Sequence, residues 1–215
     1  LLATEASTRA GHISFAQERY QQALQIYQPL LEESEDPLVH GQAILALFRL
    51  ERLSEGRKAA KRFAKRFEGS IQWNQRFLLE EGQYYLQAGR YKKAISAFEK
   101  VEKHGGEWAD DGAYWETTAH WRENEAAPSE EKAAYALEAV SRFVKEYPLS
   151  PLAADAYLLL GNYQFSLHNY LQAAGAYKRV LDAPDIDPEL SQDAIWKLLK
   201  SYQGAHEYQA AHQVV

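Results

Sequence analysis

Small and aromatic residues recur at fixed offsets along this chain. In three stretches a glycine is followed by a tyrosine nine residues later, an alanine twelve residues later and an aromatic residue sixteen residues later. Such offsets place the small and aromatic residues on facing sides of two consecutive helices. We therefore expect each stretch to fold as a pair of antiparallel helices that meet at the small residues. The positions are Gly11, Tyr20, Ala23 and Tyr27; Gly82, Tyr91, Ala94 and Phe98; and Gly161, Tyr170, Ala173 and Tyr177.

Weaker copies of this pattern fill the gaps between the three stretches. Leu47, Thr118 and Leu199 stand in the glycine position, so the copies begin at residues 11, 47, 82, 118, 161 and 199. The interval after Thr118 is the longest, because six residues are inserted near Pro128 and Ser129. A proline followed by a serine predicts a turn and then a helix N-cap at this point. The spacing indicates six repeats of one structural unit.

The pattern resembles the tetratricopeptide repeat, a unit of about 34 residues with a conserved order of aromatic, Leu-Gly and Ala positions. The match is clearest in one repeat, which carries Tyr157, Leu160 and Gly161 in its first half and Ala173 and Tyr177 in its second. The resemblance implies an all-α fold, a right-handed superhelical array of about six helix–turn–helix repeats in a single domain. We expect the repeats at about residues 4–37, 38–70, 75–107, 110–150, 153–187 and 190–215, with the last one incomplete at Val215.

Composition and charge narrow the classes of partner. The chain has 215 residues, 24 Lys and Arg, 30 Asp and Glu, and no cysteine, which excludes disulfides and thiolate metal sites. Its net charge of −6 argues against a general nucleic-acid binder, which needs a basic surface. No apolar run approaches the ~18 residues of a transmembrane helix. We expect neither a nucleic-acid partner nor a membrane-spanning segment in this chain.

Sequence signatures of catalysis are lacking. The chain has no nucleophile-elbow, dinucleotide-binding, P-loop or HExxH motif, and its seven histidines are scattered. His206 and His212 are six residues apart, which does not align them on one helix face. We therefore expect a protein without enzymatic activity, with no catalytic residues, no cofactor and no metal site.

The resemblance also implies where a partner would bind. In this family the first helix of each repeat lines the concave surface, and in this chain apolar residues occupy many of its inward positions. An apolar, aromatic groove of this kind suits an amphipathic helix or an extended apolar peptide. The alternative, weighed evenly, is that packing between repeats buries several of these side chains. The predicted groove residues are Phe15, Ile44, Phe48, Leu79, Leu86, Trp115, Leu158, Phe165 and Trp196.

Some members of the family instead grip a C-terminal carboxylate with Lys, Asn and Arg side chains. In this chain only Asn162 and Lys200, with Lys197 nearby, offer such groups. Apolar residues stand at the places where the clamp needs cations, so we do not expect a carboxylate clamp.

Two segments carry unbalanced charge. Between residues 57 and 66 six cations alternate with apolar residues, which predicts an amphipathic helix with one cationic face. That face is either merely solvated or a contact for an acidic partner or anionic lipid. Residues 105–131 are net −7 and hold three tryptophans, which fits an acidic surface over core rings or an edge that recognises a basic or aromatic segment. The cations of the basic face are Arg57, Lys58, Lys61, Arg62, Lys65 and Arg66.

A narrower resemblance concerns one junction between repeats. Residues 147–151 read YPLSP and are followed by Leu160 and Gly161, a pattern similar to that of bacterial cell-envelope repeat proteins. These include the TolA-binding periplasmic proteins and the helical lipoprotein of the outer-membrane β-barrel assembly machine. The resemblance implies a scaffold for a protein or peptide segment, in the bacterial periplasm or associated with the outer membrane. A cytoplasmic adaptor or co-chaperone, and an accessory or regulatory domain of a larger enzyme, remain alternatives, and homo-oligomers are possible.

Overall fold

The computed structural model describes residues 2–184 and 186–214, without the side chains of residues 2 and 3. Val215, where the last predicted repeat ends, lies outside this range. The described residues form twelve α-helices and one short 3₁₀ helix, which confirms the predicted all-α fold. The chain divides into two compact units, residues 1–112 and 113–215.

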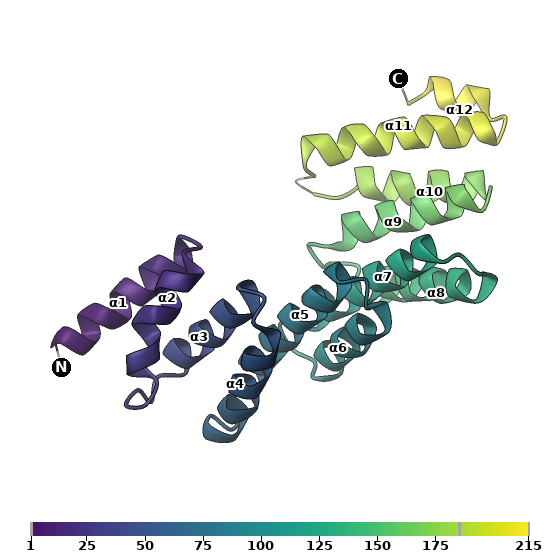
Figure 1. Cartoon of the computed structure of the whole chain (residues 1–215). Helices are drawn as coiled ribbons and strands as arrows, with labels where there is room; N and C mark the ends of the chain where they lie inside the picture. The colour runs from purple at the N-terminus through teal and green to yellow at the C-terminus, as the bar shows by residue number, and fades with distance from the viewer. Residues whose placement is uncertain (1, 185, 215) are drawn as a thin grey trace. The chain divides into compact units, whose positions relative to one another are not determined.

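Unit 1 is built from three helical hairpins in sequence (Figure 1). Each helix packs against the next one along the chain, and α3 also packs against α1 and α5. The first helices of the three hairpins therefore lie side by side. The elements are α1 (Leu2–Ala16), α2 (Tyr20–Tyr27), the 3₁₀ helix η1 (Gln28–Leu30), α3 (Pro37–Arg49), α4 (Leu53–Arg66), α5 (Ile71–Gln87) and α6 (Tyr91–Lys103).

Unit 2 continues the same alternation of helices. Helices α8 to α12 each pack against the next, and α7 joins them through Ala113, which shares a buried cluster with Val140, Phe143 and Ala156. The helices follow one another in three further pairs. The elements are α7 (Ala109–Ala126), α8 (Glu130–Glu146), α9 (Ala153–Ser166), α10 (Tyr170–Leu181), α11 (Pro188–Gly204) and α12 (Tyr208–His212).

A close contact between a glycine and an aromatic ring joins the helices of three hairpins. In each case the ring lies over the glycine sixteen residues before it, where a Cβ atom would come within 3.0 Å of the ring carbons. Folded proteins do not tolerate such an approach without rearrangement. The recurrence of Gly and aromatic residues at this offset is thus a packing constraint between paired helices. The pairs are Gly11 with Tyr27, Gly82 with Phe98 and Gly161 with Tyr177.

The turns inside five of the hairpins share one backbone conformation, from which the longer turn between α7 and α8 differs. A residue of positive φ follows the first helix, and the amide of the next residue bonds to a carbonyl five residues back, as in Arg90 to Tyr85 and Asn169 to Gln164. This is the Schellman arrangement, which closes a helix with a left-handed residue. The residues of positive φ are Glu18, Glu51, Gly89, His168 and His206.

The inserted turn in the fourth repeat also has the predicted cap. Ser129 precedes α8, and its hydroxyl accepts a hydrogen bond from the backbone amide of Lys132 at 3.2 Å. This bond satisfies one of the amides left without a partner at a helix start. The predicted N-cap is therefore confirmed.

Two of the three rings over glycines are tyrosines with bonded hydroxyls. The Tyr177 hydroxyl donates a hydrogen bond to Asn162 Oδ1 at 3.0 Å, and the Tyr27 hydroxyl donates to the Gln42 side chain. Both residues are almost wholly buried. Burial raises the pKa of Tyr27 and of Tyr177 well above the ordinary tyrosine value of 10.0, because the phenolate would lose its hydration.

The glycine contact predicts opposite effects of one substitution at two sites. Gly161→Ala should lower the free energy of unfolding by about 1–3 kcal/mol, because the new methyl group would overlap the Tyr177 ring. Gly175→Ala is the matched control in α10, where a Cβ meets nothing within 4 Å; it should raise stability by about 0.5–1 kcal/mol through helix propensity. Urea denaturation measures both, and shifts of the same sign would contradict the packing constraint.

The buried tyrosines predict a loss of stability at alkaline pH. Above about pH 10 the tyrosines of the unfolded chain ionise, whereas Tyr27 and Tyr177 stay protonated in the folded protein. The unfolded state then binds fewer protons, so the free energy of unfolding falls as pH rises. Tyr177→Phe should make this fall shallower, as measured by urea denaturation at a series of pH values. An unchanged slope would show that Tyr177 ionises equally in both states.

Candidate functional site

Three of the predicted groove residues belong to the core. Ile44, Phe48 and Leu79 are 3%, 5% and 7% exposed. The Phe48 ring packs on Gly56 of α4, whose Cβ would lie 3.2 Å from it, so it points toward the second helix of its own hairpin. Packing between helices takes up these side chains, which corrects the expectation that they line an open groove.

Five other predicted groove residues are partly buried. Phe15 and Phe165 occupy equivalent places, and each meets the first tyrosine of the following helix edge to face, Phe15 with Tyr20 and Phe165 with Tyr170. These rings therefore pack across the turns of their hairpins, and only part of their surface faces solvent. The remaining three are Leu86, Trp115 and Leu158.

Trp196 differs from all of these because it is 58% exposed. It lies on α11, and Lys200 of the next turn holds its Nζ 4.9 Å from the centre of the indole ring. A large ring left in water costs free energy that a partner could recover by covering it. Trp196 is thus the most accessible of the predicted groove residues.

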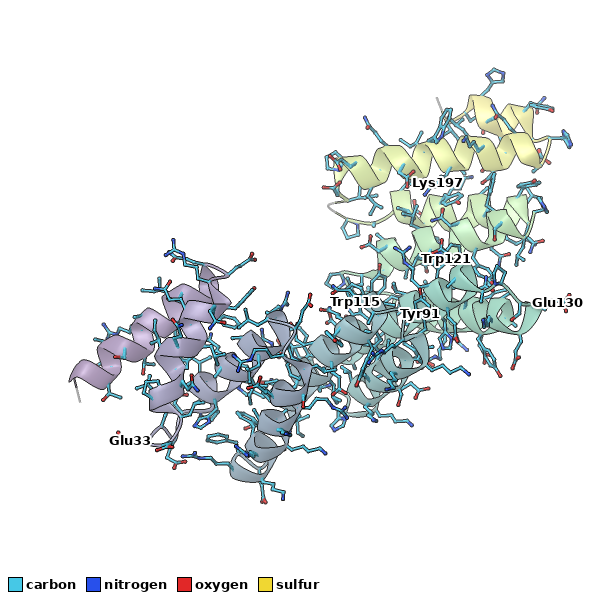
Figure 2. The ribbon with its side chains drawn as sticks, viewed as in Figure 1. Glu33, Tyr91, Trp115, Trp121, Glu130 and Lys197 are labelled. Atoms are coloured by element: carbon cyan, nitrogen blue, oxygen red, sulfur yellow. The ribbon has the colours of Figure 1, made fainter. Side chains whose placement is uncertain are left out.

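The groups that could have formed a carboxylate clamp are engaged elsewhere. Lys197 pairs with Asp193 at 2.7 Å, and the Asn162 side chain accepts the hydroxyl of Tyr177. Figure 2 shows Lys197 on α11. With Lys200 over the ring of Trp196, each of the three candidate groups has a partner within unit 2.

The tryptophans of the acidic segment are partly buried. Trp121 meets Tyr163 with ring centres 5.2 Å apart, and the guanidinium of Arg76 lies 5.6 Å from the Trp108 ring. Trp115 and Trp121 both project from α7 (Figure 2). These contacts favour the interpretation of an acidic surface over packed rings.

The predicted cationic face of α4 is divided by its neighbours. Arg66 turns toward the loop after η1, where it donates to the Leu31 and Ser34 carbonyls at 3.3 and 3.0 Å and pairs with Glu35 at 2.7 Å. The hydrogen bond and charge of Arg66 hold the pKa of Glu35 below its usual range. Arg57 turns the other way and pairs with Glu81 of α5 at 3.1 Å. All six cations are exposed, but they do not form one uniform face.

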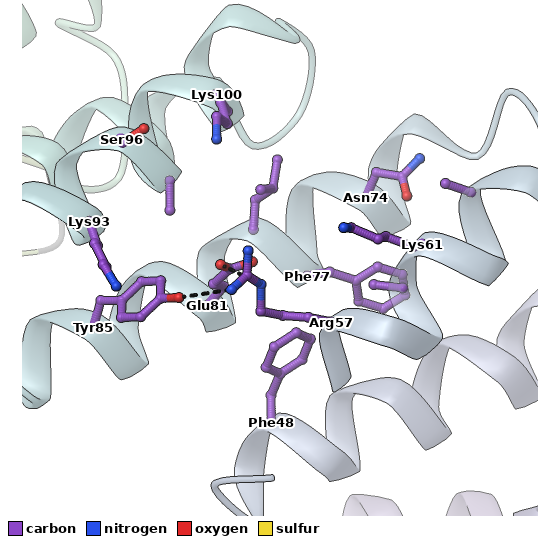
Figure 3. A pocket seen from close by; sticks show the side chains of 14 residues that line it. Phe48, Arg57, Lys61, Asn74, Phe77, Glu81, Tyr85, Lys93, Ser96 and Lys100 are labelled. Atoms are coloured by element: carbon purple, nitrogen blue, oxygen red, sulfur yellow. Dashed lines mark hydrogen bonds and ion pairs between the residues drawn. The ribbon is translucent and has the colours of Figure 1, made fainter. Parts of the chain in front are cut away.

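A cleft of about 520 Å³ opens on the Arg57 side of α4. Its walls come from α4 and α6, and α5 forms its floor (Figure 3). The cations of α4 are evident in the sequence but the cleft is not, because the other wall lies about 35 residues further along the chain.

The described residues hold neither a candidate membrane span nor a candidate metal site. None of the helices there has the length and apolarity that crossing a bilayer requires. No group of three or more His, Cys, Asp or Glu side chains within those ranges is arranged to hold a metal ion.

Comparison with known families identifies the class of protein. The family model for the tetratricopeptide repeat matches residues 42–111 and 130–189, more than half of the chain. The chain therefore belongs to the tetratricopeptide repeat family, whose members are scaffolds for protein–protein interaction and typically are not enzymes. Curated protein sequences gave no match.

Solved structures share the fold at low sequence identity. BtubC from P. vanneervenii is 19% identical, with a TM-score of 0.63 over 96% of this chain and 88% of that one. The pilF protein of Pseudomonas aeruginosa is 12% identical, with a TM-score of 0.59 over 99% and 88% of the two chains. Yeast Tom70 is 12% identical, with a TM-score of 0.64 over 96% of this chain and 40% of its own. At these identities the likeness concerns the fold alone.

The exposure of Trp196 can be checked without a partner. An indole in water emits at longer wavelength than a buried one, because water relaxes around its excited-state dipole. Trp196→Phe should therefore shift the fluorescence maximum of the protein to shorter wavelength and reduce quenching by acrylamide. Trp121→Phe, at a ring packed on Tyr163, is the control and should shift the maximum the other way or not at all. Equal effects of the two substitutions would contradict the exposure difference.

Proposed function

We propose that this protein is a non-enzymatic scaffold that binds an apolar segment of a partner protein at the surface around Trp196. The observation that carries the proposal is the exposure of this ring, 58%, at an inward position of a first helix of the repeat. Exposed tryptophans in a concave surface are frequent centres of binding energy. The partner segment is an amphipathic helix or an extended apolar stretch, the two forms that repeat grooves accept.

Neighbouring apolar residues support this location. Leu158 and Phe165 of α9 have the same inward register as Trp196, and both are partly exposed. They also pack on the buried cluster that includes Leu198 of α11, so α9 and α11 share one core. A segment that covers Trp196 can therefore extend along apolar surface held by a common set of buried side chains.

We also propose that the scaffold works in a bacterial cell envelope. The support is the YPLSP junction at residues 147–151, where Leu149 is 96% exposed at the surface between α8 and α9. Fractionation of the cells that produce the protein tests the location. Recovery with the periplasm or outer membrane would support the proposal, and recovery with the cytosol would favour the adaptor alternative.

The binding proposal is tested with peptides selected for affinity from a random library displayed on phage. Trp196→Ala should weaken a selected peptide by about 2 kcal/mol, roughly thirtyfold. Leu171→Ala is the control, because Leu171 is 57% exposed but lies on α10, a second helix of its hairpin. Titration calorimetry measures both affinities.

Salt dependence separates this mode of binding from a charged one. Contact through Trp196, Leu158 and Phe165 should change little between low and moderate salt, because apolar burial is not screened. An affinity that Trp196→Ala leaves intact, or selected peptides that are held by their terminal carboxylate through Lys197 and Lys200, would overturn the proposal.

A further inference from the structure

We propose that the cleft between α4, α5 and α6 is a second binding site, which takes an acidic peptide segment of a partner protein. This site lies wholly in unit 1, whereas the surface around Trp196 lies in unit 2. It therefore goes beyond the function proposed above and does not depend on it.

Small side chains on both walls keep the cleft open. Ala60 and Ala64 lie one turn apart on α4, and Ser96 and Ala97 face them from α6. The resulting volume of about 520 Å³ falls within the range of ~300–1,000 Å³ that is typical of ligand-binding pockets. Leu78 on the floor is only partly buried. The cleft can therefore accept a few residues of a peptide, including one apolar side chain.

The charges that line the cleft are unbalanced. Arg57, Lys61, Lys93 and Lys100 contribute four cations, against the single carboxylate of Glu81 (Figure 3). Arg57 reaches from the α4 wall to the floor, where it pairs with Glu81 at 3.1 Å and donates to the Tyr85 hydroxyl at 3.3 Å. The net charge of the lining is thus strongly positive.

The lysines of the cleft have no acidic partner within the part of the chain that the structure describes. Lys93 lies with its Nζ 5.5 Å from the centre of the Tyr85 ring, and Lys61 and Lys100 make no ion pair with the described carboxylates. Three ammonium groups around one depression repel one another, and an incoming carboxylate relieves this repulsion. The lysines are therefore the groups that an acidic ligand would engage.

The cationic surface continues beyond the cleft. An adjoining hollow of about 410 Å³ shares Arg57, Lys61 and Lys93 and adds Lys58 and Arg90. It lies at the start of α4 and just before the start of α6, and helix N-termini carry partial positive charge. A ligand longer than the cleft would thus meet further positive charge at this end.

An acidic peptide fits this site better than a membrane or a nucleic acid. The chain as a whole carries a net charge of −6, so a large anionic surface that extends well beyond the two hollows would meet repulsion. A short segment feels only charges within the screening length of ~8 Å. The cavity is also concave, with the partly exposed Leu78 on its floor, which favours a ligand that inserts side chains over a flat surface.

Fluorescence polarisation with defined probes tests the proposal on the full chain. The probe is a labelled peptide of repeated Glu-Glu-Leu triplets, and its control has Gln in place of Glu. The acidic peptide should bind, with an affinity that falls steeply as salt is added, and the Gln peptide should not. Failure of the acidic peptide to bind would overturn the proposal.

Two matched charge reversals locate the binding. Lys61→Glu with Lys93→Glu changes two residues that line the cleft, one on each wall. Lys65→Glu with Lys92→Glu makes the same change in net charge on the same two helices, at exposed positions that line neither hollow. The first pair should weaken the acidic peptide by about tenfold or more, because reversed charges repel it, and the second by much less.

A variant that keeps all charges completes the test. Ser96→Trp places a large ring at an exposed position on the wall of α6 and should block the peptide while circular dichroism stays unchanged. Trp196→Ala should leave this peptide bound as before, which distinguishes a failure here from a failure of the proposed function. If the two double variants lost equal affinity for the acidic peptide, the proposal would be overturned, because the peptide would then respond to the overall charge of the protein and not to the cleft. Cleft-dependent binding of phosphatidylserine vesicles without binding of the peptide would overturn it in favour of a membrane.

Discussion

The close contact between a glycine of the first helix and a ring of the second is the constraint on which three of the hairpins depend. Because Gly11 and Gly161 lack a Cβ, the rings of Tyr27 and Tyr177 can fill the interface and become almost wholly buried. The same depth brings their hydroxyls to polar side chains of first helices, Gln42 in the next repeat for Tyr27 and Asn162 for Tyr177. Each ring thus sets the distance between the two helices of its hairpin. The hydroxyl of Tyr27 also links its hairpin to the next one through Gln42. Stacking of neighbouring hairpins then buries the faces that no single hairpin could bury.

The constraint inside a hairpin could be read from the sequence, because it restricts residue type at a fixed offset. The contacts between hairpins could not. Gly41 receives the ring of Trp73 from the next repeat, and Gly204 receives Tyr170 from the preceding one, at separations that do not recur along the chain. The left-handed residues of the turns could not be predicted from the sequence either, because only Gly89 among them is a glycine. Their conformation follows from the Schellman hydrogen bonds, which any residue can make at some cost in backbone strain.

The binding surfaces, too, could be predicted only in part from the sequence. Position in a helix tells which way a side chain points, but not whether a neighbour covers it. Ile44 and Trp196 both stand three residues before the glycine position of their repeats, yet Ile44 is buried and Trp196 remains in water. Phe48 also has the inward register, but its ring packs on Gly56 of the second helix of its hairpin. The cleft was still harder to predict from the sequence. Its positive charge depends on Lys93 and Lys100, which in the sequence look like ordinary surface residues of a helix. Only the apposition of α4 and α6 turns them into a site.

The two proposed surfaces differ in the physics of binding, and the Arg57–Glu81 pair sets the character of the cleft. An acidic ligand that approaches Arg57 must compete with Glu81, which already lies 3.1 Å from the guanidinium, so this exchange of one carboxylate for another yields little net free energy. The gain must then come from Lys61, Lys93 and Lys100, whose exposed charges are attractive but strongly screened. Such a site acts mainly on the rate of encounter and on the choice of partner, while an apolar side chain held against Leu78 prolongs the contact. The surface around Trp196 has the opposite balance, with energy from burial and little sensitivity to salt.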